Sequence, residues 1–406
     1  MSMTSPAAAG SPRALVTDPG RWPAHDDLLR YRADFPIFEK VNYLNSCSLG
    51  ALSVRSMAGI NEYMTLWGSM GASAWYEIWL GRLAALRENL GALINASADE
   101  IAIGPSISSA VSVIASCIDY SKRNKVVMAD LDFPTLGHQW LAKRKQRVEV
   151  EFVPSRNRVS VDLDAFERAI DERTALVATS HVFFTSGYVQ DIKAIAEIAH
   201  RKGALVLIDA YQATGQIPTD VKDANVDFLL SGGLKWLLGG TGIVFTYARR
   251  DLIPQLQPAI PGWFAVNNQF GFDIHALEYR PDAGRLEQGT PSISAVYALL
   301  GGLSYVQEIG PPALRERTQH LSEDLIARAL AAGFVPRVAD DPAQRSGIVL
   351  LNMDNPRPVV AALAQAGTIV DMRPGAVRVS PYFYNTIAEN QVVIDAMVQI
   401  RDQAAG

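Results

Sequence analysis

Between about residues 100 and 250, apolar strands alternate with amphipathic helices, and this alternation constrains the fold more than any other feature. In residues 192–202 the apolar side chains recur at helical spacing. The segment Ala204–Ala210 (ALVLIDA) is apolar except for its single aspartate, as a strand covered on both faces requires. The pattern predicts an α/β fold with a mainly parallel seven-stranded sheet between helices.

The seven predicted strands are Glu100–Ile103, Lys125–Ala129, Val148–Val153, Ala175–Ser180, Ala204–Ala210, Phe228–Leu230 and Gly242–Tyr247. After about residue 270 the pattern changes to longer helices and short strands, which indicates a smaller α+β domain. We therefore expect a mobile tail over residues 1–20, a large domain over 51–270, and a small domain built from 21–50 with 271–406.

Composition excludes several classes of protein. The net charge is −5 with no long run of like charges, which disfavours nucleic acid as a partner. The stretch Phe228–Ala248 is apolar but carries five glycines and a lysine, so we expect no membrane span. Two cysteines and no apolar leader segment favour a reducing, cytoplasmic location.

Polar residues at the carboxyl ends of the strands are the first candidates for a site, because ligands of open α/β sheets bind there. Asp209 ends an apolar strand, where burying a carboxylate is unfavourable unless it has a partner. Lys235 lies in the glycine-rich segment SGGLKWLLGGTG, and burial would lower the pKa of such a lysine and make it a nucleophilic amine. Taken alone, the aspartate could be a helix cap and the lysine could reach solvent.

Together the two residues predict pyridoxal phosphate (PLP) as the cofactor. A buried lysine can form the Schiff base, and a buried carboxylate can keep the pyridine nitrogen protonated. The sequence contains no P-loop, no dinucleotide fingerprint in its proper context, no G-x-S-x-G elbow and no HExxH or paired CxxC, so we expect no metal.

Residues 209–245 resemble the cofactor segment of class V aminotransferases, which are fold type I PLP enzymes and include kynureninases and cysteine desulfurases. Two further motifs are similar to the family's, RLEQGTP at 285–291 and MRPGAVRVSPYFYNT at 372–386. The resemblance runs from about Tyr43 to the last helix, and it implies a homodimer whose active sites are shared between subunits.

The resemblance also implies roles for individual residues. Lys235 matches the Schiff-base lysine and Asp209 the partner of the pyridine nitrogen. Cofactor contacts are expected from Ile107, Ser108, Phe133, Ser180 or His181, Gln212, Ser231, Gly233, Trp263 and Thr290, of which Trp263 and Thr290 belong to the second subunit's site. Substrate contacts are expected from Arg378, which matches the arginine that binds the α-carboxylate, from Arg373 as its alternative, and from Ser48.

Departures from the family patterns bear on the reaction. The stretch between Arg373 and Arg378 holds no cysteine and is too short for the loop that carries the desulfurase persulfide. Leu234 precedes the lysine, where kynureninases carry a tyrosine. We therefore expect a PLP enzyme acting on an α-amino acid or related amine, and an aminotransferase first. A β-lyase or an epimerase remains the alternative.

Overall fold

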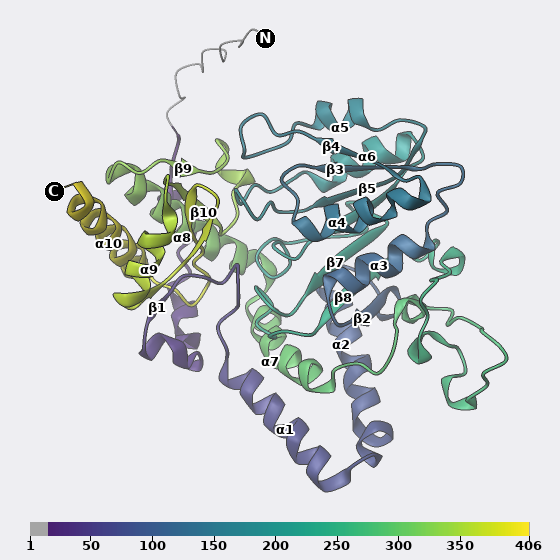
Figure 1. Ribbon diagram of the computed structural model, residues 1–406. Helices are drawn as coiled ribbons and strands as arrows, with labels where there is room; N and C mark the ends of the chain where they lie inside the picture. Colours follow the sequence, from purple (N-terminus) through teal and green to yellow (C-terminus); the bar gives the residue numbers. More distant parts are fainter. Residues whose placement is uncertain (1–14, 406) are drawn as a thin grey trace.

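The computed structural model describes residues 15–405 and consists of a large lobe built on one sheet and a smaller lobe beside it (Figure 1). Most of the predicted N-terminal tail, residues 1–14, lies outside the described part. Residues 15–20 contact the small lobe, where Arg345 Nη2 donates to Val16 O at 2.9 Å. Residues 15–20 therefore pack with the small lobe, although we expected that lobe to start at residue 21.

The large lobe contains a seven-stranded sheet, which confirms the predicted fold class. Its order is β2 (Ile101–Gly104), β8 (Val244–Ala248), β7 (Phe228–Gly232), β6 (Leu205–Asp209), β5 (Thr174–Ser180), β3 (Lys125–Ala129) and β4 (Glu149–Val153). All neighbouring strands pair in parallel except β8, which is antiparallel to both β2 and β7. The start of β8 therefore lies at the same edge as the carboxyl ends of the parallel strands.

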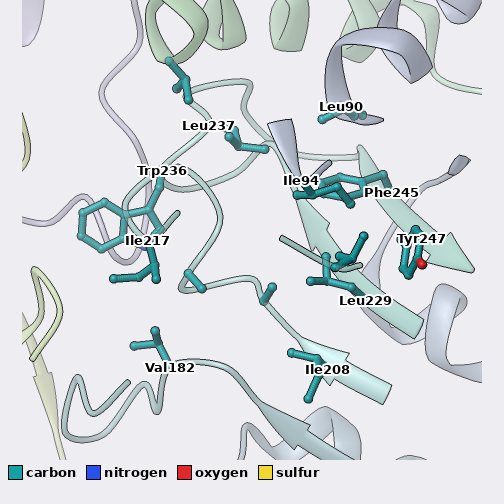
Figure 2. Close-up of a cluster of buried hydrophobic side chains, with 14 of the residues drawn as sticks. Leu90, Ile94, Val182, Ile208, Ile217, Leu229, Trp236, Leu237, Phe245 and Tyr247 are labelled. Carbon is teal, nitrogen blue, oxygen red and sulfur yellow. The ribbon is translucent and has the colours of Figure 1, made fainter. Parts of the chain in front are cut away.

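Helices cover both faces of this sheet. The strand residues alternate between two apolar clusters, so that Val206 and Ile208 face one layer while Leu207 faces the other. The first layer includes α2 (Leu80–Leu93), α5 (Leu163–Ala169) and α6 (Ile192–Arg201), and the second includes α3 (Ile107–Cys117) and α4 (Pro134–Ala142). Figure 2 shows part of the first cluster, in which Ile208, Leu229 and Phe245 project from adjacent strands.

Helix α7 (Ile293–Ile309) packs along α1 (Val54–Met70) in the large lobe, as Figure 1 shows at the bottom of the view. The two helices approach closely at Gly59, where a Cβ atom would lie 2.6 Å from Tyr297 O. Residues 271–310 therefore pack with the large lobe, whereas we expected the small domain to begin at 271. The change of sequence pattern at 270 marks a change of element type and not of lobe.

The small lobe consists of a four-stranded antiparallel sheet with helices packed on it. The sheet has the order β12 (Asp371–Arg373), β13 (Ala376–Val379), β10 (Val349–Asn352) and β9 (Pro336–Arg337). The helices are α8 (Pro311–Ala331), α9 (Pro356–Gln365) and α10 (Ile387–Ala405). A separate two-stranded parallel pair joins β1 (Asn42–Tyr43) to β11 (Thr368–Ile369), which ties residues before the large lobe to the small lobe. No helix within residues 15–405 has both the length and the apolar character that a membrane crossing requires.

Candidate active site

A cavity of about 420 Å³ opens at the carboxyl ends of the parallel strands, between the two lobes. Its walls come from the turns that follow β2, β3, β5, β6 and β7, from the start of β8, from the 45–50 turn and from β12. The predicted site residues along it are Ser48, Ile107, Ser108, Phe133, Ser180, Asp209, Gln212, Lys235 and Arg373. This convergence of segments far apart in the sequence makes the cavity the candidate active site.

Among residues 15–405, Lys235 is the only lysine along this cavity. Burial lowers the pKa of its amine to about 8, although the nearby Asp209 carboxylate acts in the opposite direction. The Nζ atom lies 4.6 Å from the centroid of the Tyr211 ring and 6.0 Å from that of Phe133. The amine therefore sits among aromatic faces and is poised to lose its proton close to neutral pH.

Asp209 ends β6 on the same wall as the lysine. Its Oδ1 accepts a hydrogen bond from the Tyr211 amide at 2.9 Å, and Oδ2 has no donor among the described residues. Burial raises the pKa of this carboxyl, while the Tyr211 amide and the Lys235 charge lower it. The free oxygen is suited to accept a hydrogen bond from a protonated ring nitrogen in the cavity.

The first turn of α3 forms an anion site on another wall. Ser106 caps the helix by accepting the Ser109 amide at 3.1 Å. The amides of Ile107 and Ser108 have no acceptor among the described residues and belong to the first turn, where no intrahelical partner exists. Together with the helix dipole, these donors suit a phosphate.

Gln212 and Ser180 are held by buried hydrogen bonds. Gln212 Nε2 donates to Cys47 O at 3.0 Å, and its Oε1 accepts from Trp236 Nε1 at 3.0 Å. The Ser180 amide donates to Asp132 Oδ1 at 2.7 Å. The Gln212 side chain and the Ser180 backbone are therefore fixed at the wall of the cavity.

Other predicted contacts do not line this cavity. His181 is buried behind the wall, its Nδ1 has no partner among the described residues, and burial lowers its pKa to about 4. Ser231 is buried, with its hydroxyl donating to Ala210 O at 3.3 Å, and Gly233 lies behind the lysine turn. Within one chain these three residues support the walls of the cavity without contacting its space.

Trp263 and Thr290, which we assigned to the second subunit's site, also lie outside the cavity. Trp263 is 41% exposed and packs against Phe272. Thr290 lines a small neighbouring cavity of about 130 Å³ that shares Pro105 and Gly242 with the main one. Both positions remain predictions for a site completed by another copy of the chain.

The two arginines differ in position. Arg373 borders the cavity, whereas Arg378 is fully buried behind it. Arg378 Nη2 donates to Ser48 Oγ at 2.6 Å and to Asp371 Oδ2 at 2.7 Å, and Arg373 Nη1 donates to the same Asp371 oxygen at 2.8 Å. Burial opposes the charged form of Asp371, but the Ser48 hydroxyl and the two guanidinium charges lower the pKa of its carboxyl to about 2. Asp371, Arg373 and Arg378 together therefore carry one net positive charge.

Sequence reasoning gave no role to several residues that border the cavity. Tyr211 lies two residues after Asp209, and its ring lies against the lysine amine. Phe184 packs edge-on against Phe133, with ring centroids 5.1 Å apart. Position after a strand end could have indicated Tyr211, but nothing in the local sequence marks Phe184. Among residues 15–405, no group of three or more His, Cys, Asp or Glu side chains is arranged to hold a metal ion.

Comparison with known proteins relates most of the chain to one family. The model described as "Aminotransferase class-V" matches residues 62–393. The uncharacterized aminotransferase YcbU of Bacillus subtilis (strain 168) is 35% identical over 366 residues, which cover 90% of this chain and 96% of that protein. The kynureninase of Bacillus anthracis is 29% identical over 383 residues, covering 90% of this chain and 89% of the relative.

Among solved structures, a lysine-to-alanine mutant of C-DES with glycine covalently linked to its PLP cofactor has a similar fold. The TM-score is 0.84 at 19% identity, and the match covers 90% of this chain and 98% of the other. At that identity the likeness concerns the fold, which agrees with the architecture described above.

Proposed function

Because this chain belongs to the aminotransferase class V family, whose cofactor is PLP, we propose that it is an aminotransferase acting on an α-amino acid. When bound, PLP links covalently to an amino group and withdraws electrons from the carbon that carries it. The donor set of the cavity fits this cofactor. The α3 amides suit its phosphate, Asp209 Oδ2 suits its ring nitrogen, and the Phe133 ring suits its planar face.

One observation carries the assignment of the reaction: among the described residues Lys235 supplies the only amine along the cavity, and its pKa is lowered to about 8. An amine with this pKa can take a proton from the substrate Cα and deliver it again near neutral pH. The Tyr211 phenol borders the same space, but burial raises its pKa to about 12, so it is a poor second base. A single base suits transamination, whereas epimerisation needs proton transfer on both faces of the substrate.

We assign the substrate's α-carboxylate to Arg378, with Ser48 as its neighbour. Arg378 is fully buried, so solvent screens its charge less than that of Arg373, and it lowers the pKa of Lys235 more than Arg373 does. Ser48 borders the cavity and donates to Asp371, while its oxygen accepts from Arg378 Nη2. A carboxylate that takes the place of the Ser48 hydroxyl would reach this guanidinium and its net positive charge.

A β-lyase is the second candidate, and the names of the relatives favour it. Relatives at 27–29% identity include kynureninases and a probable cysteine desulfurase, and one protein of similar structure is a cystine C-S lyase. Leu234, which precedes Lys235, offers no phenol for proton transfer of the kynureninase kind. A persulfide mechanism on the 373–378 stretch is disfavoured, because that stretch contains no cysteine.

We also propose that the protein works as a homodimer. Exposed apolar side chains gather on residues 260–277, where Phe272 is 70% and Ile274 is 89% exposed, and Tyr76 packs against Phe270 beside them. Such a patch suits burial against a second copy, and it contains Trp263. Light scattering of the PLP-loaded protein should give about twice 44.1 kDa. A fully active monomer would contradict a site shared between subunits.

The reaction is tested by mixing the PLP-loaded protein with a panel of amino acids and following both the cofactor spectrum and the products. Transamination converts the bound cofactor to its pyridoxamine form and releases the 2-oxo acid of the donor. Cleavage of the amino acid with an unchanged cofactor, releasing either ammonia or a shortened amino acid, would identify a lyase instead. Loss of optical rotation without a new product would identify an epimerase.

A further inference from the structure

A second cavity of about 270 Å³ lies next to the candidate active site and shares two walls with it, Phe184 and Arg373. The Arg373 guanidinium lies 5.6 Å from the centroid of the Phe184 ring, so this pair stands between the two spaces. A ligand held near Lys235 would have to pass this pair to reach the second cavity. The remaining charged residues around it are Asp130, Asp132, Arg158 and Arg337.

Arg158 and Arg337 are close together and have no acidic partner. If Gly375 carried a Cβ atom, that atom would lie 3.4 Å from Arg337 Nη2 and 3.9 Å from Arg158 Nη2. No carboxylate of residues 15–405 lies within 4.0 Å of either guanidinium. Arg337 is only 8% exposed, and its donors reach Asn352 Oδ1 at 2.9 Å and Gly375 O at 3.1 Å. A buried arginine without a counter-ion is unfavourable unless a ligand brings the negative charge.

Within residues 15–405 the two aspartates form no ion pair with these arginines, and they accept hydrogen bonds from backbone and hydroxyl groups instead. Asp130 Oδ1 accepts the Ser155 amide at 3.0 Å. Asp132 accepts the amides of Ala129 and Ser180, at 2.9 and 2.7 Å. Arg373 is paired with Asp371 at 2.8 Å, so the unpaired positive charge of this cavity comes from Arg158 and Arg337, which no carboxylate of residues 15–405 contacts. Thr185 Oγ1 adds a buried hydroxyl with no partner among the described residues.

The loop that carries Arg158 is held in one conformation. Arg158 has a φ of +62°, in the left-handed region that residues other than glycine seldom adopt. Asn157 Oδ1 accepts the amides of both Val159 and Ser160 at 2.9 Å, which fixes this turn. These two hydrogen bonds stabilise the turn from which the Arg158 side chain extends.

We propose that this second cavity is the subsite for an anionic group at the end of the substrate's side chain, either a carboxylate or a phosphate. The inference rests on the proposed function, because it places the α-carbon of the substrate at Lys235. It makes an acidic amino acid, or the corresponding 2-oxo acid, the preferred substrate of this enzyme. Arg158, Arg337 and Arg373 then determine specificity, and Thr185 supplies a further donor.

The first experiment compares matched substrates on the PLP-loaded protein. L-glutamate is paired with L-glutamine, and O-phospho-L-serine with L-serine, so that each pair separates the terminal charge from chain length. In the pair whose terminal group fits the second cavity, we expect the anionic member to have a kcat/KM at least about tenfold higher than its neutral partner. The two pairs distinguish a carboxylate from a phosphate. Equal values within both pairs would overturn the subsite.

Substitutions of Arg158, on an exposed loop, test whether the preference for the anionic substrate arises in this cavity. Arg158→Asn removes the charge with a residue that tolerates a left-handed backbone, and it should lower the anionic preference about fivefold. Arg158→Lys should restore most of it. The control Arg156→Asn removes a charge two positions away that does not border the cavity, and it should leave the preference unchanged. An equal loss for both members of a pair would show that Arg158 is not a specificity residue.

A binding measurement separates failure of the subsite from failure of the proposed reaction. Glutarate and pentanoate have five carbons each but two and one carboxylates, and their binding to the PLP-loaded protein can be measured by calorimetry. We expect glutarate to bind about tenfold or more tightly, with the difference reduced in Arg158→Asn. If this holds while no amino acid converts the cofactor, the subsite stands and the aminotransferase proposal fails. If both ligands bind alike, the subsite is wrong whatever the reaction.

Discussion

Gly50 lies directly against the backbone carbonyl of Lys235: a Cβ atom on Gly50 would be 2.1 Å from that oxygen. The Gly50 amide also donates to Leu234 O at 2.9 Å. The turn that enters the large lobe from the N-terminal side therefore fixes the segment carrying the lysine. Residues separated by 185 positions in the chain set the direction of one side chain.

We predict that Gly50→Ala displaces the Lys235 turn and lowers kcat by about tenfold or more, because a non-bonded carbon atom cannot lie 2.1 Å from a carbonyl oxygen. Steady-state kinetics and the visible spectrum of the bound cofactor measure the effect. Gly68→Ala is the control, since a Cβ there meets nothing within 4 Å, and on helix α1 it should stabilise slightly. Normal activity in Gly50→Ala would mean that the turn moves freely.

Asp209→Ala should reduce turnover far more than cofactor retention. The carboxylate is suited to stabilise a protonated ring nitrogen, and removing such an electrostatic contact lowers kcat by about 100-fold or more. The phosphate donors of α3 are untouched, so most of the cofactor should stay bound. The absorbance of the desalted protein measures its cofactor content. Full activity of Asp209→Ala would show that the role of Asp209 is only structural.

The sequence predicts most of the large lobe because its strands are buried on both sides. Every strand of the large sheet lies within two residues of its predicted bounds. Helix α1 was not predicted, because its sequence shows little apolar periodicity. Ser56 is the only residue of this helix that is buried. The lobe boundary at 270 was misplaced for a related reason, because the apolar residues of α7 do not show which lobe they contact.

The site was predictable where its residues follow strand ends or match a family motif. Lys235, Asp209 and Phe133 belong to such segments and border the cavity. Arg158 and Arg337 come from a loop and a two-residue strand 179 positions apart, and only the tertiary fold brings them together. The burial of Arg378 behind Ser48 likewise depends on the packing of the 45–50 turn against β13.

The cofactor-free protein should gain stability as the pH rises from about 8 to 10.5, owing to Lys235. Burial lowers the pKa of the folded amine to about 8, so within this window the unfolded chain holds a proton that the folded chain lacks. Raising the pH therefore favours the folded state, by up to about 3 kcal/mol.

Urea unfolding of the wild type and of Lys235→Met across this pH window measures the gain. Because the methionine cannot titrate, the difference in unfolding free energy between the two proteins should change with pH. A constant difference would show that the pKa of Lys235 is not lowered.

Arg378→Ala should raise the KM for an amino acid about 30-fold or more, because a buried, charge-assisted contact to a carboxylate is lost. The decarboxylated analogue of the same amino acid should be affected much less. Arg373→Ala provides the comparison, and a selective effect there instead would exchange the roles of the two arginines. Equal losses for acid and amine in both variants would indicate general damage to the small lobe.

Reduction with borohydride followed by peptide mapping tests most directly whether Lys235 carries the cofactor. Reduction fixes the cofactor to the amine that holds it, and mass spectrometry then locates the modified peptide. We predict the label on the peptide containing Lys235 and no labelled peptide from Lys235→Ala treated in the same way. A label on any other lysine, such as the ion-paired Lys125, would contradict the account.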